Sequence, residues 1–158
     1  FIDEIHTIMP GVEGSAYSGL AEVMKPYLTI GDLRVIGATT EDEYRMFVQK
    51  DAALDRRFQK VTLDVPDAHQ TVRILESLRE SFTTHYGIDI SDEALQIIVD
   101  ITQKHMRKRN QPDKSIVLLD SACAYHVMYE GGETGTLSLN AIYQMAARET
   151  GVHAKALQ

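Results

Sequence analysis

Three pairs of polar residues in the first part of the chain have side chains of the kinds that phosphoryl transfer uses. They are Asp3-Glu4, Thr39-Thr40 and Arg56-Arg57. One carboxylate of an acidic pair can hold a hydrated Mg²⁺ while its neighbour orients an attacking water. A threonine hydroxyl can contact a phosphate or that water, and an arginine can neutralise the charge that develops during transfer. Each pair alone is a weak signal, because each also has a plainer structural interpretation.

For the acidic pair the plainer interpretation is a solvated turn, and for Thr40 it is a helix cap. Thr40 and Glu43 have the spacing of a capping box, and a cap is worth about 1 kcal/mol. His6 follows Asp3 and Glu4, but the spacing matches neither a helical histidine pair nor a zinc signature. We therefore expect His6 to pack or to form a hydrogen bond with a neighbour.

The two arginines also have an ordinary explanation. They follow Asp51 and Asp55, so they could form surface ion pairs with these carboxylates. Such pairs contribute little to stability. Taken by itself, the arginine pair therefore indicates no more than a charged surface.

Apolar and β-branched segments predict the elements that carry these pairs. Buried strands are predicted at residues 1–2, 33–38 and 59–65. Helices are predicted over residues 15–28 and 40–47. Strands that alternate with helices indicate a parallel sheet, whose strands end at a common edge. The acidic pair and the threonine pair are therefore expected to face the same crevice.

From Pro66 onward the sequence pattern is almost entirely helical. Capping residues and apolar spacing predict helices over residues 67–86 and 91–106, from 112 to about 130, and from 138 onward. We therefore place a boundary at Pro66. The expected domains are residues 1–65 and 66–158.

Composition restricts the classes of protein to consider. The chain has 158 residues, and 44% hydrophobic with 25% charged residues is typical of a globular protein. No apolar run approaches the roughly 20 residues of a membrane span, so no membrane contact is expected. The net charge of -7 argues against a broad nucleic-acid surface. A single cysteine, with nothing that reads as a signal peptide, predicts a cytoplasmic location, and the apolar first residues suggest an excerpt of a longer protein.

The order of the motifs closely resembles the AAA+ unfoldases of the Clp family, and in particular their first ATPase module. The resemblance runs from residue 1 to about residue 124. Residues 1–6 (FIDEIH) resemble the Walker B segment, and residues 37–45 (GATTEDEYR) resemble sensor 1. Residues 50–58 (KDAALDRRF) are similar to the arginine-finger segment, and residues 112–120 (PDKSIVLLD) to the start of the lid helix.

The resemblance implies an α/β fold class in the form of an incomplete AAA+ module. The first domain would be the C-terminal part of a parallel-sheet α/β large subdomain. The second would be the α-helical small (lid) subdomain, ending in a linker to a following module. Asp3 would help to hold Mg²⁺, Glu4 would polarise the hydrolytic water, and Thr40 would sense the γ-phosphate. Arg56 and Arg57 would reach into the next subunit of a homo-hexamer as arginine fingers.

The resemblance also implies further contacts with nucleotide and substrate. Residues expected near the nucleotide base are Ile74, Pro112, Asp113 and Lys114. Gly14 and Tyr17 fall in the place of a pore loop that touches substrate polypeptide. That loop is equally compatible with plain surface flexibility.

The implied cofactors are ATP and Mg²⁺, and the implied partners are substrate polypeptides and a ClpP-type protease. The sequence contains no Gly-x-x-x-x-Gly-Lys-Ser/Thr motif, so the backbone cradle for the phosphates is missing. We therefore expect the 158 residues alone not to hydrolyse ATP. Two alternatives are a non-catalytic assembly platform derived from AAA+ and an AAA+ clamp or helicase loader. The upstream sequence and a polyanion-binding assay would separate these possibilities.

Overall fold

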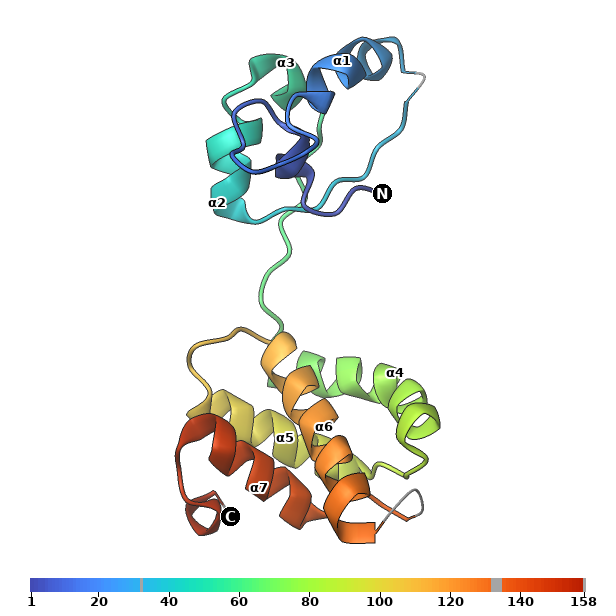
Figure 1. Cartoon of the computed structure of the whole chain (residues 1–158), viewed down its shortest axis with the longest axis vertical. Helices are drawn as coiled ribbons and strands as arrows, with labels where there is room; N and C mark the ends of the chain where they lie inside the picture. Colours follow the sequence, from blue (N-terminus) through green and yellow to red (C-terminus); the bar gives the residue numbers. More distant parts are fainter. Residues whose placement is uncertain (32, 132–134, 158) are drawn as a thin grey trace. The chain divides into compact units, whose positions relative to one another are not determined.

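A computed structural model describes residues 1–31, 33–131 and 135–157 of the chain. The chain folds into two compact units, Phe1–Thr62 and Leu63–Gln158 (Figure 1). Among the described residues, no helix has both the length and the apolar character required to cross a membrane. Each unit has its own hydrophobic core.

The first unit is built from short helical segments. They are the 3₁₀ turn η1 (Ile5–Ile8), α1 (Leu20–Ile30), α2 (Glu41–Glu43), the π-helical turn η2 (Tyr44–Val48) and α3 (Ala52–Asp55). α1 begins five residues later than predicted, because Gly19 precedes it in the left-handed conformation. Gly31 closes α1 in the same conformation, as the sequence indicated.

The predicted strands of this unit are reduced to one parallel bridge between Ile2 and Gly37. The Ile2 amide donates to the Ile36 carbonyl, and the Ala38 amide donates to the Ile2 carbonyl. The parallel direction matches the prediction, but the described residues form no extended sheet. The α/β architecture that we expected is therefore not seen.

The prediction of a strand over residues 59–65 is wrong for this structure. The segment has no regular structure, and its alternating apolar side chains are exposed: Val61 is 76% and Leu63 89% exposed. A strand needs a neighbour to pair its amides and carbonyls, and no described segment lies in register with this one. The alternating apolar residues have the spacing of a strand, but the spacing does not identify a second segment with which a strand could pair.

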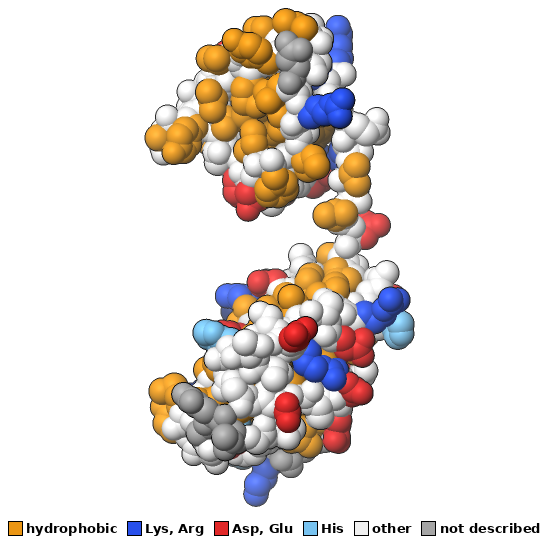
Figure 2. All heavy atoms as spheres, turned by 90° about the vertical axis from the view of Figure 1, so that its right-hand side faces the viewer, with side chains coloured by type: hydrophobic (Ala, Val, Ile, Leu, Met, Phe, Trp, Pro, Cys, Tyr) orange, Lys and Arg blue, Asp and Glu red, His pale blue; other side chains and the backbone are white. Residues whose placement is uncertain are grey.

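The core of the first unit is small. The buried apolar residues are Ile5, Ile8, Met9, Ala21, Val48 and Leu54. Many large apolar side chains of this unit remain exposed, and Figure 2 shows hydrophobic side chains gathered on one face of it. The polar groups discussed below are therefore supported by few buried contacts.

The second unit is helical, as predicted. Its elements are α4 (Ala68–Tyr86), α5 (Asp92–His105), α6 (Asp113–His126), the π-helical turn η3 (Val127–Gly131), α7 (Leu139–Thr150) and the 3₁₀ turn η4 (Ala154–Ala156). The Asp67 carboxylate accepts from the Gln70 amide while the Gln70 side chain accepts from the Asp67 amide, which completes the predicted capping box. Ser91 and Ser138 cap α5 and α7. The capping residues in the sequence therefore predicted correctly where these helices begin.

Helix α6 lies at the centre of this unit and packs against α4, α5 and α7 (Figure 1). Leu118 and Leu119 of α6 are fully buried among apolar side chains of the other helices. The buried hydroxyls of Thr102 and Ser115 lie 2.7 Å apart, and Gln111 bonds to both. Because these buried polar groups form hydrogen bonds with one another, the bonds offset the cost of removing them from water between α5 and α6.

Candidate functional site

The Glu43 carboxylate is the centre of a hydrogen-bond cluster in the first unit. Its Oε2 accepts from the Thr40 hydroxyl at 2.7 Å, from the Thr40 amide at 3.1 Å and from the Thr39 hydroxyl at 3.1 Å. The hydrogen bond from the Thr40 hydroxyl is the main reason why the pKa of Glu43 lies below its usual value. Thr40 thus forms the predicted capping box with Glu43, and Thr39 joins the same carboxylate.

The imidazole of His6 lies between this cluster and the acidic pair. Its Nδ1 is 2.9 Å from Thr39 Oγ1 and 3.3 Å from Glu43 Oε2, and its Nε2 is 3.7 Å from Glu4 Oε2. The residue is only 8% exposed, and its ring stacks on Phe47 at a centroid distance of 6.0 Å. The expectation that His6 is a packed, hydrogen-bonded neighbour is confirmed.

The acidic pair lies at the end of the bridge formed by Ile2. The Ile5 amide donates to the Ala38 carbonyl, which keeps Glu4 close to the segment that leads into the threonines. Glu4 has φ 51° and ψ 47°, and no other described residue except glycine has a positive φ. The Glu4 amide donates to Asp3 Oδ1 at 3.1 Å, and both side chains are exposed. The structure thus brings Glu4 and the threonine pair together, with His6 and Glu43 between them.

Gly37 allows this close approach. A Cβ atom at Gly37 would lie 3.1 Å from both Cβ and Cγ2 of Ile5 and would collide with its Cδ1. No larger residue fits here unless Ile5 moves. The absence of a side chain at Gly37 therefore lets the segment carrying the threonines lie against the segment carrying the carboxylates.

The two arginines at the end of α3 differ in their surroundings. The guanidinium of Arg57 donates to the Ala53 carbonyl in the preceding turn. Arg56 is exposed and forms no ion pair with a described residue. A surface hollow of about 670 Å³ lies beside them, lined by Leu28, Thr29, Ala52, Ala53, Arg56 and Arg57. Arg56 is therefore the side chain that can extend toward another molecule.

The carboxylates that precede the arginines bind other partners. Asp51 accepts from the amides of Ala53 and Leu54, and it lies 2.6 Å from Lys25 Nζ. The hydrogen bond from Lys25 is the main reason why the pKa of Asp51 is lowered. Asp55 accepts from the Tyr44 hydroxyl. Sequence analysis paired these aspartates with the arginines, whereas in the structure they hold α3 against α1 and η2.

The loop before α1 is fastened at two serines. Ser15 Oγ donates to the Thr7 carbonyl at 2.6 Å, and Ser18 Oγ donates to the Met9 carbonyl at 3.2 Å. Tyr17 lies between them and is 66% exposed, and Gly14 has φ 76°. The loop therefore presents an aromatic side chain to solvent on a backbone held at both sides.

The residues expected near the nucleotide base lie in the second unit. Ile74 and Pro112 are half-buried, and Asp113 lies 3.4 Å from the guanidinium of Arg109. Lys114 is 9% exposed, and its Nζ donates to the Met106 carbonyl at 2.9 Å. Its ammonium therefore fastens the loop before α6 instead of facing solvent.

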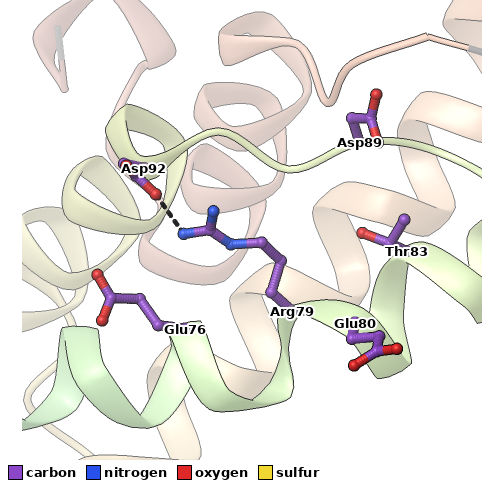
Figure 3. A pocket seen from close by; sticks show the side chains of 6 residues that line it. All are labelled: Glu76, Arg79, Glu80, Thr83, Asp89 and Asp92. Carbon is purple, nitrogen blue, oxygen red and sulfur yellow. Dashed lines mark hydrogen bonds and ion pairs between the residues drawn. The ribbon is translucent and has the colours of Figure 1, made fainter.

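A separate hollow of about 560 Å³ lies between α4 and the start of α5. It is lined by Glu76, Arg79, Glu80, Thr83, Asp89 and Asp92 (Figure 3). Four carboxylates surround a single guanidinium, which forms an ion pair with Asp92. This charge would repel a nucleotide polyphosphate. The hollow contains none of the predicted base-contacting residues.

Comparison with known proteins gives consistent results. Residues 67–154 match the AAA lid domain family. The chaperone protein ClpB of Dichelobacter nodosus is 45% identical over 124 residues, and that of Aquifex aeolicus is 46% identical over 124 residues. These matches cover 78% of this chain but only 14% and 12% of the relatives, so the chain spans a small part of their length.

Solved structures agree with this result. The Hsp104-ADP complex of S. cerevisiae has a TM-score of 0.81 and 38% identity, and the match covers all of this chain and 26% of that one. A closed-state structure of Hsp104 with ATPγS and FITC casein has a TM-score of 0.82 and 38% identity over 96% of this chain and 26% of that one. The chain belongs to the Clp family of AAA+ proteins, and its helical unit contains the AAA lid domain.

Proposed function

We propose that the chain is part of an ATP-hydrolysing protein unfoldase of the ClpB and Hsp104 type. The observation that carries the proposal is the cluster in which His6 and Glu43 connect Glu4 to the threonine pair. A carboxylate and a hydroxyl close together beside the bridge between Ile2 and Gly37 are suited to orient a water and to contact a phosphate. In this proposal, residues 1–65 belong to the α/β large subdomain and residues 66–158 form the lid and the start of a linker.

Each residue of the cluster has one role in the proposed hydrolysis. Glu4 accepts a hydrogen bond from the attacking water and turns its lone pair toward the γ-phosphorus. The Thr40 hydroxyl, which now donates to Glu43, contacts the γ-phosphate. Arg56 extends into the site of the next subunit, with Arg57 beside it, and stabilises negative charge there. This last role requires a closed ring, which we propose is a homo-hexamer.

Asp3 fits a role in holding Mg²⁺. It is exposed, and one of its oxygens accepts from the Glu4 amide, while its other oxygen forms no hydrogen bond with the described residues. A free carboxylate oxygen is the ligand type that a hydrated Mg²⁺ takes. When bound, the ion would neutralise charge on the phosphates. The base would lie near Ile74 and the 112–114 turn of the lid.

The remaining partners follow from the same proposal. Tyr17, with Gly14 in the same loop, would contact substrate polypeptide; the related Hsp104 structure was determined with casein. The names of the relatives describe a chaperone, so the proposed output is polypeptide unfolding, and a ClpP-type protease stays a prediction from the sequence. ATP turnover would need the phosphate-binding motif that these 158 residues lack.

The proposal is tested by Glu4→Gln in the full-length protein that carries this segment. We expect ATP to bind with unchanged affinity and steady-state turnover to fall by about 100-fold or more, because the water loses its carboxylate. Radiolabelled ATP should then remain bound in the ring. Unchanged turnover in this variant would reject the role of Glu4, and a wild-type protein without turnover would favour the assembly platform.

The arginine assignment is tested with mixed rings. Arg56→Ala should lower turnover, and the defect should be rescued when a neighbouring subunit supplies an intact Arg56 to the affected site. Arg45→Ala is the matched control, because this exposed arginine of the same unit pairs with Glu41 four residues before it. Equal defects in both variants, with no rescue in mixed rings, would contradict the assignment of Arg56 as the extended side chain.

A further inference from the structure

The side chain of His6 lies where the two halves of the proposed hydrolytic site meet. Its Nε2 faces Glu4 at 3.7 Å, while its Nδ1 faces Thr39 at 2.9 Å and Glu43 at 3.3 Å. The three side chains Glu4, His6 and Glu43 are also of metal-ligating types, with ligand atoms within 4.8 Å of one another. Two roles are therefore conceivable for His6: ligand of a transition metal, or link between two carboxylates.

The contacts favour the link. A histidine binds a metal ion through one ring nitrogen, but here different nitrogens of His6 face the two glutamates. The Oε2 atom of Glu43 already accepts from Thr40 and Thr39. These hydrogen bonds occupy the lone pairs of the Glu43 oxygen that faces His6. One edge of the imidazole is hydrogen-bonded to Thr39 and the other edge lies against Glu4, so the ring is suited to hold these two segments relative to each other.

We propose that His6 is a positioning residue that fixes the Glu4 carboxylate relative to Thr39 and Thr40. The ring itself cannot reorient freely, because it is buried and stacks on Phe47. Glu4 needs such support, since its left-handed backbone conformation is one that residues with a side chain rarely adopt. Through Nε2 the ring restrains the end of the Glu4 side chain, and through Nδ1 it ties this restraint to the threonine segment.

The inference rests on the proposed function for its effect on catalysis. If Glu4 orients the attacking water, loss of the restraint leaves the carboxylate misplaced in most molecules. Turnover should then fall while ATP binding is retained, because His6 itself does not touch the nucleotide. Groups that orient a catalytic residue typically change activity by about 10- to 100-fold.

Three substitutions of His6 distinguish the contribution of Nδ1 from that of Nε2. His6→Asn keeps an amide near the position of Nδ1, His6→Gln places one near Nε2, and His6→Phe keeps the ring without either nitrogen. In the full-length protein we expect kcat to fall about 10- to 100-fold in His6→Phe with KM for ATP nearly unchanged. Gln should recover more activity than Asn, since it can still reach Glu4. Wild-type kcat in a folded His6→Phe, or equal loss in all three variants, would overturn the proposal.

A second measurement does not depend on activity. In the full-length protein with ¹³C-labelled glutamate, the carboxyl signal of Glu4 should move when His6 is replaced by Phe or Asn. The signal of Glu13, an exposed carboxylate of the same unit, is the control. If the carboxyl signal of Glu43 shifts in these variants while that of Glu4 does not, then His6 does not hold Glu4, and the proposal is refuted. If wild-type protein shows no ATP turnover, the proposed function fails, whereas this measurement still decides whether His6 holds Glu4.

Discussion

The two units of the chain bury their apolar side chains to very different degrees. Among the residues that the structure describes, the helical unit has a continuous core of seventeen buried apolar residues, whereas the core of the first unit has six. Exposed large apolar side chains are concentrated in the first unit, where Figure 2 shows hydrophobic side chains gathered on one face. They include Phe1, Val23, Tyr27, Ile30 and Ile36. The hydrophobic effect therefore stabilises the helical unit more than the first unit, where polar contacts around Glu43 and α3 accompany a smaller apolar core.

The largest expected effect comes from separating the units. We expect residues 63–158 alone to unfold in one cooperative transition, because all four long helices contribute to the same core. Residues 1–62 alone should show no cooperative transition, because six buried side chains cannot offset the conformational entropy of the chain. Circular dichroism during urea titration measures both. A sharp transition in the shorter piece would show that its polar cluster is sufficient for folding.

Single apolar truncations test the same contrast within the intact chain. Ile98→Ala in α5 should cost about 2 to 5 kcal/mol of unfolding free energy, because Ile98 is fully buried and its loss leaves a cavity. Ile36→Ala is the control in the first unit, where the side chain is 72% exposed, and it should change stability by about 0.5 kcal/mol or less. Denaturant midpoints give both values. A cost above about 1 kcal/mol for Ile36→Ala would mean that a partner covers this side chain in solution.

A smaller loss is expected where the first unit is packed most tightly. Gly37→Ala places a Cβ against Ile5, so the bridge to Ile2 must open or Ile5 must move, at a cost of about 1 to 3 kcal/mol. The combination with Ile5→Val should cost less than the sum of the two changes, because the smaller side chain relieves the overlap. Proteolysis of the first unit measures the effect. Strictly additive costs would indicate that Gly37 does not contact Ile5.

The helical unit could be predicted almost completely from local sequence. Asp67 with Gln70, Ser91 and Ser138 each cap a helix within four residues, so their role depends on the sequence beside them. The strand predicted over residues 59–65 failed for the opposite reason. Its alternation describes one face of a sheet, but pairing depends on a second segment that alternation does not identify.

The sequence predicted that the acidic pair and the threonine pair lie close together, but it did not predict which side chains join them. The roles of Asp3, Glu4 and Thr40 stay predictions from residue type and motif order. The contact between His6 and Thr39 spans thirty-three residues, so no local pattern reports it. The pairing of Asp51 with Lys25 was missed for the same reason, since the arginines are nearer in the sequence. Long-range polar contacts are decided by the packing of the segments that carry them.

The smallest expected effect is an alkaline loss of stability confined to the helical unit. Burial, together with a hydrogen bond to Asp120, raises the pKa of Tyr86 to about 12. Burial also raises the pKa of the Cys123 thiol to about 12. For both groups the folded state holds its proton more tightly than the unfolded state does. The stability that these two protonated groups give to the folded state is therefore fully present below their ordinary pKa values, about 8.5 for cysteine and about 10 for tyrosine. It is lost as the pH rises toward 12.

Tyr86→Phe isolates the phenol, because it keeps the ring that stacks on Phe82 and removes only the group that titrates. Between about pH 10 and 12, the urea midpoint of residues 63–158 should fall less steeply in this variant than in the wild type. Tyr129→Phe is the matched control, since that ring is 67% exposed, and its midpoint should follow the wild-type curve. If Tyr86→Phe also follows the wild-type curve, then the hydrogen bond to Asp120 does not persist in solution. In that case Tyr86 is more exposed than the structure indicates, and the two units differ less in burial at the end of α4.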